Sequence, residues 1–82
     1  IAKAARSAAM LSGAPYTLNG VEYQISFTKD DGDGLMQVKA AFELGLASTN
    51  IHFENGTIMP ITAAEFSAFA AWFVARRNEF FV

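Results

Sequence analysis

The feature that most constrains the fold of this chain is an Asn-Gly dipeptide that occurs twice, each time between short segments in which apolar and polar residues alternate. Asn-Gly favours a two-residue hairpin turn because both residues accept positive φ. The first copy, Asn19-Gly20, lies within residues 15–28, whose alternation has the period of a half-buried strand. A two-residue turn predicts these cross-strand pairs: Leu18 with Val21, and Tyr16 with Tyr23.

The second dipeptide, Asn55-Gly56, predicts another hairpin over residues 51–60. In this hairpin we expect Phe53 on the same side as Ile58, and His52 on the opposite side beside Met59. Pro60 limits its strand to an edge or an end of a sheet, since proline lacks the amide hydrogen of a central strand.

Three helices are expected around these hairpins. Residues 1–12 are rich in alanine and are followed by Gly13, a typical helix stop. Residues 35–44 carry a second apolar stripe, for which Asp33 is the expected N-cap and Gly45 the stop. Thr62 and Glu65 have the spacing of a capping box, which predicts a third helix to about residue 79. Its expected core face is formed by Phe66, Phe69, Ala70, Phe73, Val74 and Phe80.

The predicted fold class is therefore α+β, with two antiparallel β-hairpins packed against three helices in the order helix-hairpin-helix-hairpin-helix. A chain of 82 residues has room for a single domain, residues 1–82. Because it does not begin with Met, we expect it to be a piece of a longer chain, which we take as the C-terminal part, or a processed protein. The apolar stripes predict one core made of Tyr23, Ile25, Phe42, Phe53, Phe66, Phe69 and Phe73.

Composition removes several classes of function. The chain has no cysteine, which excludes disulfides and thiolate chemistry. Its net charge is -2, with no basic stripe, so nucleic acid is not an expected partner. No apolar run approaches the roughly 20 residues that cross a bilayer. The sequence also lacks the motifs of a nucleophile elbow or a phosphate loop, and we expect neither a small-molecule substrate nor an enzyme.

The acidic segment 29–34 resembles a calcium loop only superficially. With Gly34 at the sixth position of the calcium-loop template, Lys29 falls at the first and Ala40 at the twelfth, where oxygen ligands are required. We therefore predict a solvated turn. His52 is the only histidine and is expected on the wet face of a hairpin. No catalytic residue, cofactor or metal is predicted.

The third helix offers the candidate interface, which consists of Trp72, Arg76, Phe80 and Phe81. Trp72 is expected roughly opposite the phenylalanine stripe, beside an arginine, and this pair of residue types is enriched in interface hot spots. The alternative is that the first helix covers Trp72 with the stripe Ile1, Ala4, Ala8 and Leu11. The sequence favours neither.

With these elements in place, the chain resembles a domain of unknown function found near the ends of bacteriophage and prophage tail-fibre and tail-associated proteins. The matching pieces run along nearly the whole chain: Arg6 and Gly13, residues 19–23, Asp30-Asp31, residues 51–56, residues 61–66, and Phe69 to Phe73. Phe53 stands where the family often has tryptophan.

The resemblance implies a non-enzymatic structural or accessory module of a phage tail-associated protein. Such a module would act through self-association or through other tail proteins, in the virion tail or in the host cytoplasm during assembly. The alternative is a small homo-oligomerising regulatory or host-interaction protein encoded by a prophage.

Overall fold

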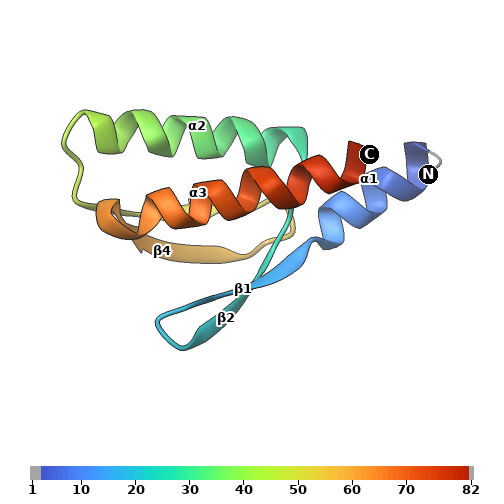
Figure 1. Cartoon of the computed structure of the whole chain (residues 1–82), viewed down its shortest axis with the longest axis horizontal. Helices are drawn as coiled ribbons and strands as arrows, with labels where there is room; N and C mark the ends of the chain where they lie inside the picture. The colour runs from blue at the N-terminus through green and yellow to red at the C-terminus, as the bar shows by residue number, and fades with distance from the viewer. Residues whose placement is uncertain (1–2, 82) are drawn as a thin grey trace.

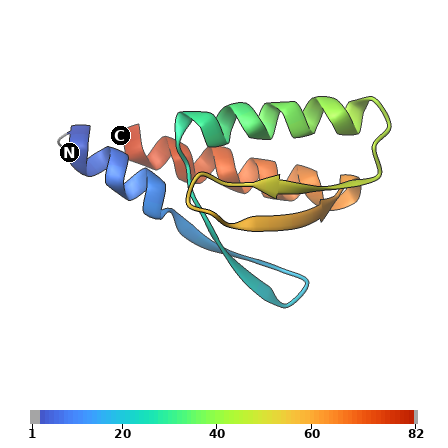
Figure 2. The same ribbon diagram turned by 180° about the vertical axis from the view of Figure 1, so that it is seen from behind.

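The computed structural model describes the backbone of residues 3–81 and the side chains of residues 8–80. The elements follow the predicted order: α1 (Lys3–Ser12), β1 (Ala14–Leu18), β2 (Val21–Ile25), α2 (Lys29–Glu43), β3 (Ser48–His52), β4 (Ile58–Thr62) and α3 (Ala63–Asn78), with a 3-10 turn over Glu79–Phe81. Helices α2 and α3 lie side by side and run in opposite directions, and the β3–β4 hairpin packs against them (Figures 1 and 2). The α+β fold with two hairpins and three helices is confirmed.

The first hairpin has the predicted register. Tyr16 pairs with Tyr23 and Leu18 with Val21, and both turn residues have positive φ, 53° at Asn19 and 80° at Gly20. Burial alternates along β1 and along β2 from Glu22 to Ile25, while Val21 beside the turn is exposed. The local sequence therefore determines this hairpin.

The second hairpin differs from its prediction, because Asn55-Gly56 lies in a longer loop between the strands. His52 pairs with Ile58, and Ile51 pairs with Met59. The loop closes by Phe53 N–H donating to Thr57 O and by Gly56 N–H donating to Phe53 O, both at 2.9 Å. Phe53 is thereby buried while Ile58 is exposed, so the prediction that they share a side was wrong, as was His52 beside Met59.

Helix α2 begins six residues earlier than predicted, at Lys29. Thr28, not Asp33, is the N-cap, and Thr28 and Asp31 form a capping box. Asp31 can be buried at the third position of this helix because both oxygens of its carboxylate accept hydrogen bonds. The expected solvated turn over residues 29–34 is thus the first turns of a helix.

Helix α1 ends as predicted at Gly13, where φ is 72° and the amide donates to Ala9 O at 2.8 Å. A Cβ at Gly13 would overlap the carbonyl of Ile25, so glycine is required there by the close approach of β2. Of the expected stripe, Ala8 and Leu11 are exposed and Met10 is the buried residue instead. Ile1 and the side chain of Ala4 lie outside the described residues.

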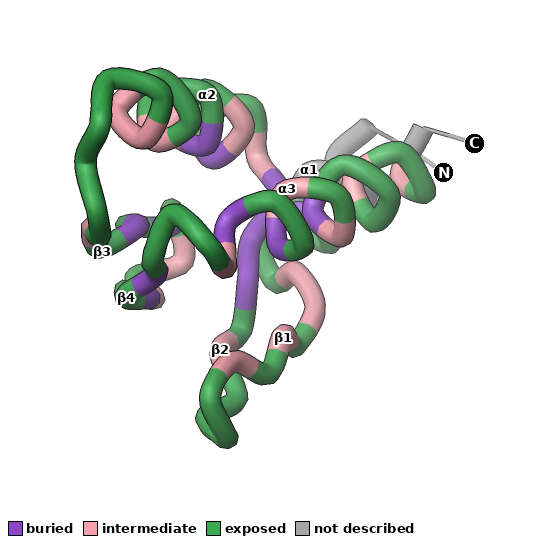
Figure 3. Tube along the Cα trace, turned by 60° about the vertical axis from the view of Figure 1, so that its left-hand side comes forward, coloured by how far each residue is buried: buried purple, intermediate pink, exposed green. Residues whose placement is uncertain are grey.

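The core lies between the helix pair and the two hairpins, and the chain stays buried from the end of β2 through Ser26 and Phe27 (Figure 3). Of the predicted core, Tyr23 and Phe42 are half-buried residues that pack against it, and the other five residues are fully inside. Val74, expected on the core face of α3, is instead exposed. The buried set is Met10, Ile25, Phe27, Leu35, Ile51, Phe53, Met59, Ile61, Phe66, Phe69 and Phe73.

Candidate functional site

The outer surface of the α2–α3 pair carries a groove with an apolar centre. The groove has a volume of about 260 Å³ and lies between the first half of α2 and the last half of α3. Met36 on α2 and Val74 on α3 line it, and these residues are 59 % and 51 % exposed. Both side chains project from helices whose opposite faces enter the core, through Leu35 on α2 and Phe73 on α3.

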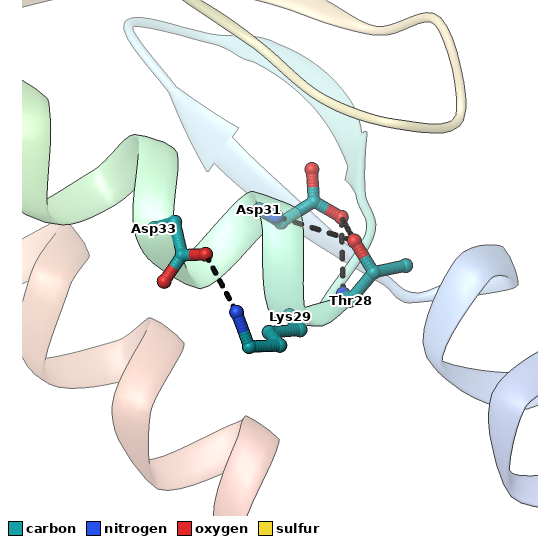
Figure 4. Close-up of polar contacts among 4 residues, drawn as sticks. All are labelled: Thr28, Lys29, Asp31 and Asp33. Atoms are coloured by element: carbon teal, nitrogen blue, oxygen red, sulfur yellow. Dashed lines mark hydrogen bonds and ion pairs between the residues drawn. The ribbon is translucent and has the colours of Figure 1, made fainter.

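The rim of this groove is polar and charged. Lys29 and Asp33 line it from α2 and form an ion pair at 3.1 Å (Figure 4). Arg77 lines it from α3, and its Nε donates to Phe27 O at 3.3 Å. A second depression continues between the same two helices towards the start of α3, with Lys39, Glu43, Phe42 and Phe66 in its lining. An apolar centre within a charged rim is the usual anatomy of a protein interface.

Beside the groove, the start of α2 is organised by the buried carboxylate of Asp31. Its Oδ2 accepts from Ser26 Oγ at 2.6 Å, from Thr28 N at 3.0 Å and from Thr28 Oγ1 at 2.8 Å, and its Oδ1 accepts from Glu54 N at 2.7 Å. Figure 4 shows the part of this network between Thr28 and Asp31. Both oxygens of Asp31 therefore accept hydrogen bonds, which hold the start of α2 to the connection after β2 and to the β3–β4 loop.

Two exposed carboxylates meet next to this network. A hydrogen bond between Glu54 and Asp30, together with charge repulsion from Asp30, raises the pKa of Glu54 above its ordinary value. Within the described part of the chain, no group of three or more Asp, Glu, His or Cys side chains could hold a metal ion.

The start of α3 contains the predicted capping box. Glu65 Oε1 accepts from Thr62 N and from Thr62 Oγ1, each at 3.0 Å, and Thr62 Oγ1 accepts from Glu65 N at 3.3 Å. Asn19, at the tip of the first hairpin, donates to Glu65 Oε2 at 2.9 Å. The hydrogen bond from the Thr62 backbone, followed by those from Asn19 and the Thr62 side chain, lowers the pKa of Glu65.

The residues of the sequence-predicted interface are partly engaged within the molecule. The ring of Trp72 lies 4.7 Å from that of Tyr16, 5.5 Å from Phe27 and 5.9 Å from Phe69, so the expectation that it faces away from the phenylalanine stripe was wrong. Trp72 and Phe80 are half-buried.

The other two residues of the predicted interface are Arg76, in the last turn of α3, and Phe81, just beyond the end of that helix. Arg76 is exposed and lies 3.4 Å from Glu79 in an ion pair. Phe81 belongs to the terminal 3-10 turn, and its side chain is outside the described residues. The role of these four residues as an interface stays a prediction.

The sequence reasoning did not consider Met36 and assigned Val74 to the core face of the third helix. Met36 is out of phase with the stripe of Leu35, Val38 and Phe42, and this offset was the available signal that it faces outwards. Val74 follows Phe73 directly, so a helical turn of about 100° per residue carries it towards the edge of the core face. His52 is exposed on β3, where it lines a shallow depression between that strand and α2.

Comparisons with known protein families, with curated proteins and with solved structures give no match for this chain. Among the helices that the structure describes, none has the length and apolar character needed to cross a membrane.

Proposed function

We propose that this domain is a non-catalytic assembly module that docks a protein partner on the outer face of α2 and α3. The observation that carries the proposal is the pair Met36 and Val74, two apolar side chains more than half exposed on neighbouring helices and lining one groove. Apolar surface gathered in this way, within a polar rim, is characteristic of interaction sites. Methionine suits such a surface because its unbranched side chain adapts to the shape of a partner.

The setting that we propose is a phage or prophage tail-associated protein, in the virion tail or in the host cytoplasm during assembly. The support for this setting is the resemblance of the sequence motifs to the tail-associated domain. The partners would be other tail proteins or further copies of the chain. The alternative function, a small homo-oligomerising regulatory or host-interaction protein of a prophage, would use the same surface.

The proposal is tested by co-expressing the chain with the proteins encoded beside its gene, and by measuring complexes with size-exclusion chromatography and light scattering. We expect the double variant Met36→Lys/Val74→Lys to lose at least about tenfold in affinity, since two charges would enter the apolar centre of the interface. The control is Leu44→Lys, because Leu44 is 90 % exposed and lies outside the groove. Binding that survives the double variant, or is lost equally in the control, would contradict the proposed surface.

A further inference from the structure

The outward stripe of α2 is arranged symmetrically about Met36. Residues at spacings of three and four along a helix share one face, and the stripe defined in this way consists of Lys29, Gly32, Asp33, Met36, Lys39, Ala40 and Glu43. All of these residues are exposed except Gly32, which is half-buried. The stripe therefore covers the solvent side of the helix from its first residue to its last.

The charges on this stripe are complementary to those on an antiparallel second copy of the same stripe. Lys29 and Glu43 each lie seven positions from Met36, and Asp33 and Lys39 each lie three positions from it. A two-fold axis through Met36 places an antiparallel copy of α2 so that Lys29 faces Glu43 of the second copy and Asp33 faces Lys39 of the second copy. A parallel copy in register would place like charges opposite one another, which is unfavourable.

Within one chain, the two outermost charges of the stripe lie at unfavourable ends of the helix. Lys29 lies at the positive N-terminal end of α2 and Glu43 at the negative C-terminal end, each opposite to what the helix dipole favours. Both ion pairs of the stripe, Lys29–Asp33 and Lys39–Glu43, have lysine before the acid, which is the weaker orientation on a helix. An antiparallel neighbour gives each end an opposite charge and the opposite end of a helix dipole.

Gly32 points to the same arrangement. It lies inside a helix, where glycine is less stable than alanine. A Cβ at this position would meet nothing closer than Arg77 Nε at 3.9 Å, an ordinary contact, so packing within the chain does not require glycine. In the antiparallel pair, Gly32 faces Ala40 of the second copy, since each lies four positions from Met36. Two small residues at this point allow the two helices to approach closely.

We infer that the chain forms a two-fold symmetric dimer in which α2 packs antiparallel against α2 of a second copy, with Met36 at the axis. This inference rests on the proposed assembly function and names its partner. Val74 lies across the groove from Met36 and extends the apolar centre. Each end of the interface then carries four charges of alternating sign, two from each copy.

The charge pattern is tested by sedimentation of the 82-residue chain and of two variants, at concentrations up to roughly 500 µM, a range that detects micromolar Kd values. Lys29→Glu/Lys39→Glu makes the stripe wholly acidic, and Asp33→Lys/Glu43→Lys makes it wholly basic. We expect each variant alone to raise the dimer Kd at least about tenfold by like-charge repulsion. An equimolar mixture of the two folded variants should dimerise again.

The position of the axis is tested separately with a thiol cross-linker, which is straightforward because the chain contains no cysteine. Met36→Cys should be joined rapidly to a second copy by a short bis-maleimide. Gln37→Cys is the matched control, since Gln37 is exposed on the same helix but turned by about 100°. Gly32→Ala should weaken the dimer, while Gly34→Ala, at a helical glycine outside the stripe, should not.

A chain that stays monomeric, or a dimer that ignores the charge variants, overturns this inference. So does cross-linking that is equally fast at Cys-substituted positions 36 and 37. A monomer that still binds a neighbouring tail protein through Met36 and Val74 overturns the dimer and leaves the proposed function standing. A chain that neither dimerises nor binds such a protein contradicts both.

Discussion

Asp31, at the start of α2, accepts hydrogen bonds from Ser26 and Thr28 in the connection after β2 and from Glu54 in the loop between β3 and β4. Asp31→Asn would keep the shape of the side chain but replace one acceptor oxygen by an NH2 group. The asparagine amide could be placed in two ways. If its oxygen replaces Oδ2 beside Ser26 and Thr28, its NH2 group faces the N–H of Glu54. If the amide is turned over, its NH2 group faces the donors of Ser26 and Thr28 instead. A buried donor would be left unpaired in either case, so we expect the free energy of unfolding to fall by about 1–3 kcal/mol, measured by urea denaturation.

The matched control is Asp33→Asn, two residues along the same helix. Asp33 is exposed, and its one ion pair, with Lys29, is exposed as well. Exposed pairs contribute little, so we expect a change below about 0.5 kcal/mol. Equal effects at the two positions would show that the Asp31 network does not stabilise the fold.

At the scale of the elements, the start of α3 depends on pH through the carboxylate of Glu65. The pKa of Glu65 is lowered in the folded chain, so folding favours its charged form. The resulting stabilisation is present above the unfolded value of about 4.5 and is lost as the pH falls through the lower folded value. We expect thermal unfolding to show this loss in the acid range, and Glu65→Gln to remove that part of the pH dependence.

Glu54 provides the contrasting case. Its pKa is raised beside Asp30, so its charged form is disfavoured by folding and its contribution to stability grows as the pH falls. Glu54→Gln should therefore not change the loss of stability that the chain shows as the pH falls through the acid range. If Glu65→Gln also leaves it intact, the cap at the start of α3 is not its source.

Turns and helix starts were predictable from the sequence where the hydrogen bonds that define them join residues close together in the chain. The turn at Asn19-Gly20 and the capping box of Thr62 and Glu65 were both confirmed, because each is closed by neighbours in the chain. The same Asn-Gly dipeptide at residues 55–56 was misread because burial of Phe53, a tertiary effect, opens the loop. The start of α2 was missed although Thr28 and Asp31 have the same capping-box spacing as Thr62 and Glu65, because the glycines and the aspartate that follow are poor helix formers and were taken for a turn.

At the scale of the whole molecule, the candidate site was less predictable than the core. Sequence periodicity located most buried aromatic residues, since a core face must be apolar. It did not show which outward apolar residues would share one surface, because Met36 and Val74 line the same groove only when α2 and α3 pack side by side. The packing of the Trp72 ring against Tyr16 was likewise not predictable from the sequence, because it depends on where the first hairpin packs against α3.

Within the described residues, the two hairpins form separate two-stranded sheets, and side chains of α3 pack against both of them. Phe69 is the central one. It is fully buried, and its ring lies 5.0 Å from that of Tyr16 in the first hairpin and 6.1 Å from that of Phe53 after β3.

Phe69→Ala should therefore lower the free energy of unfolding by about 3–5 kcal/mol, the range for a large aromatic residue removed from a core. Val74→Ala, on the exposed side of the same helix, should change it by less than about 1 kcal/mol. Fluorescence of Trp72, the only tryptophan, reports on the ring cluster and circular dichroism reports on the helices. If Phe69 unites the hairpins in one cooperative core, the two signals give the same urea midpoint in the unmodified chain. A loss below about 1 kcal/mol on Phe69→Ala, or separate midpoints before any substitution, would show that the hairpins are held independently.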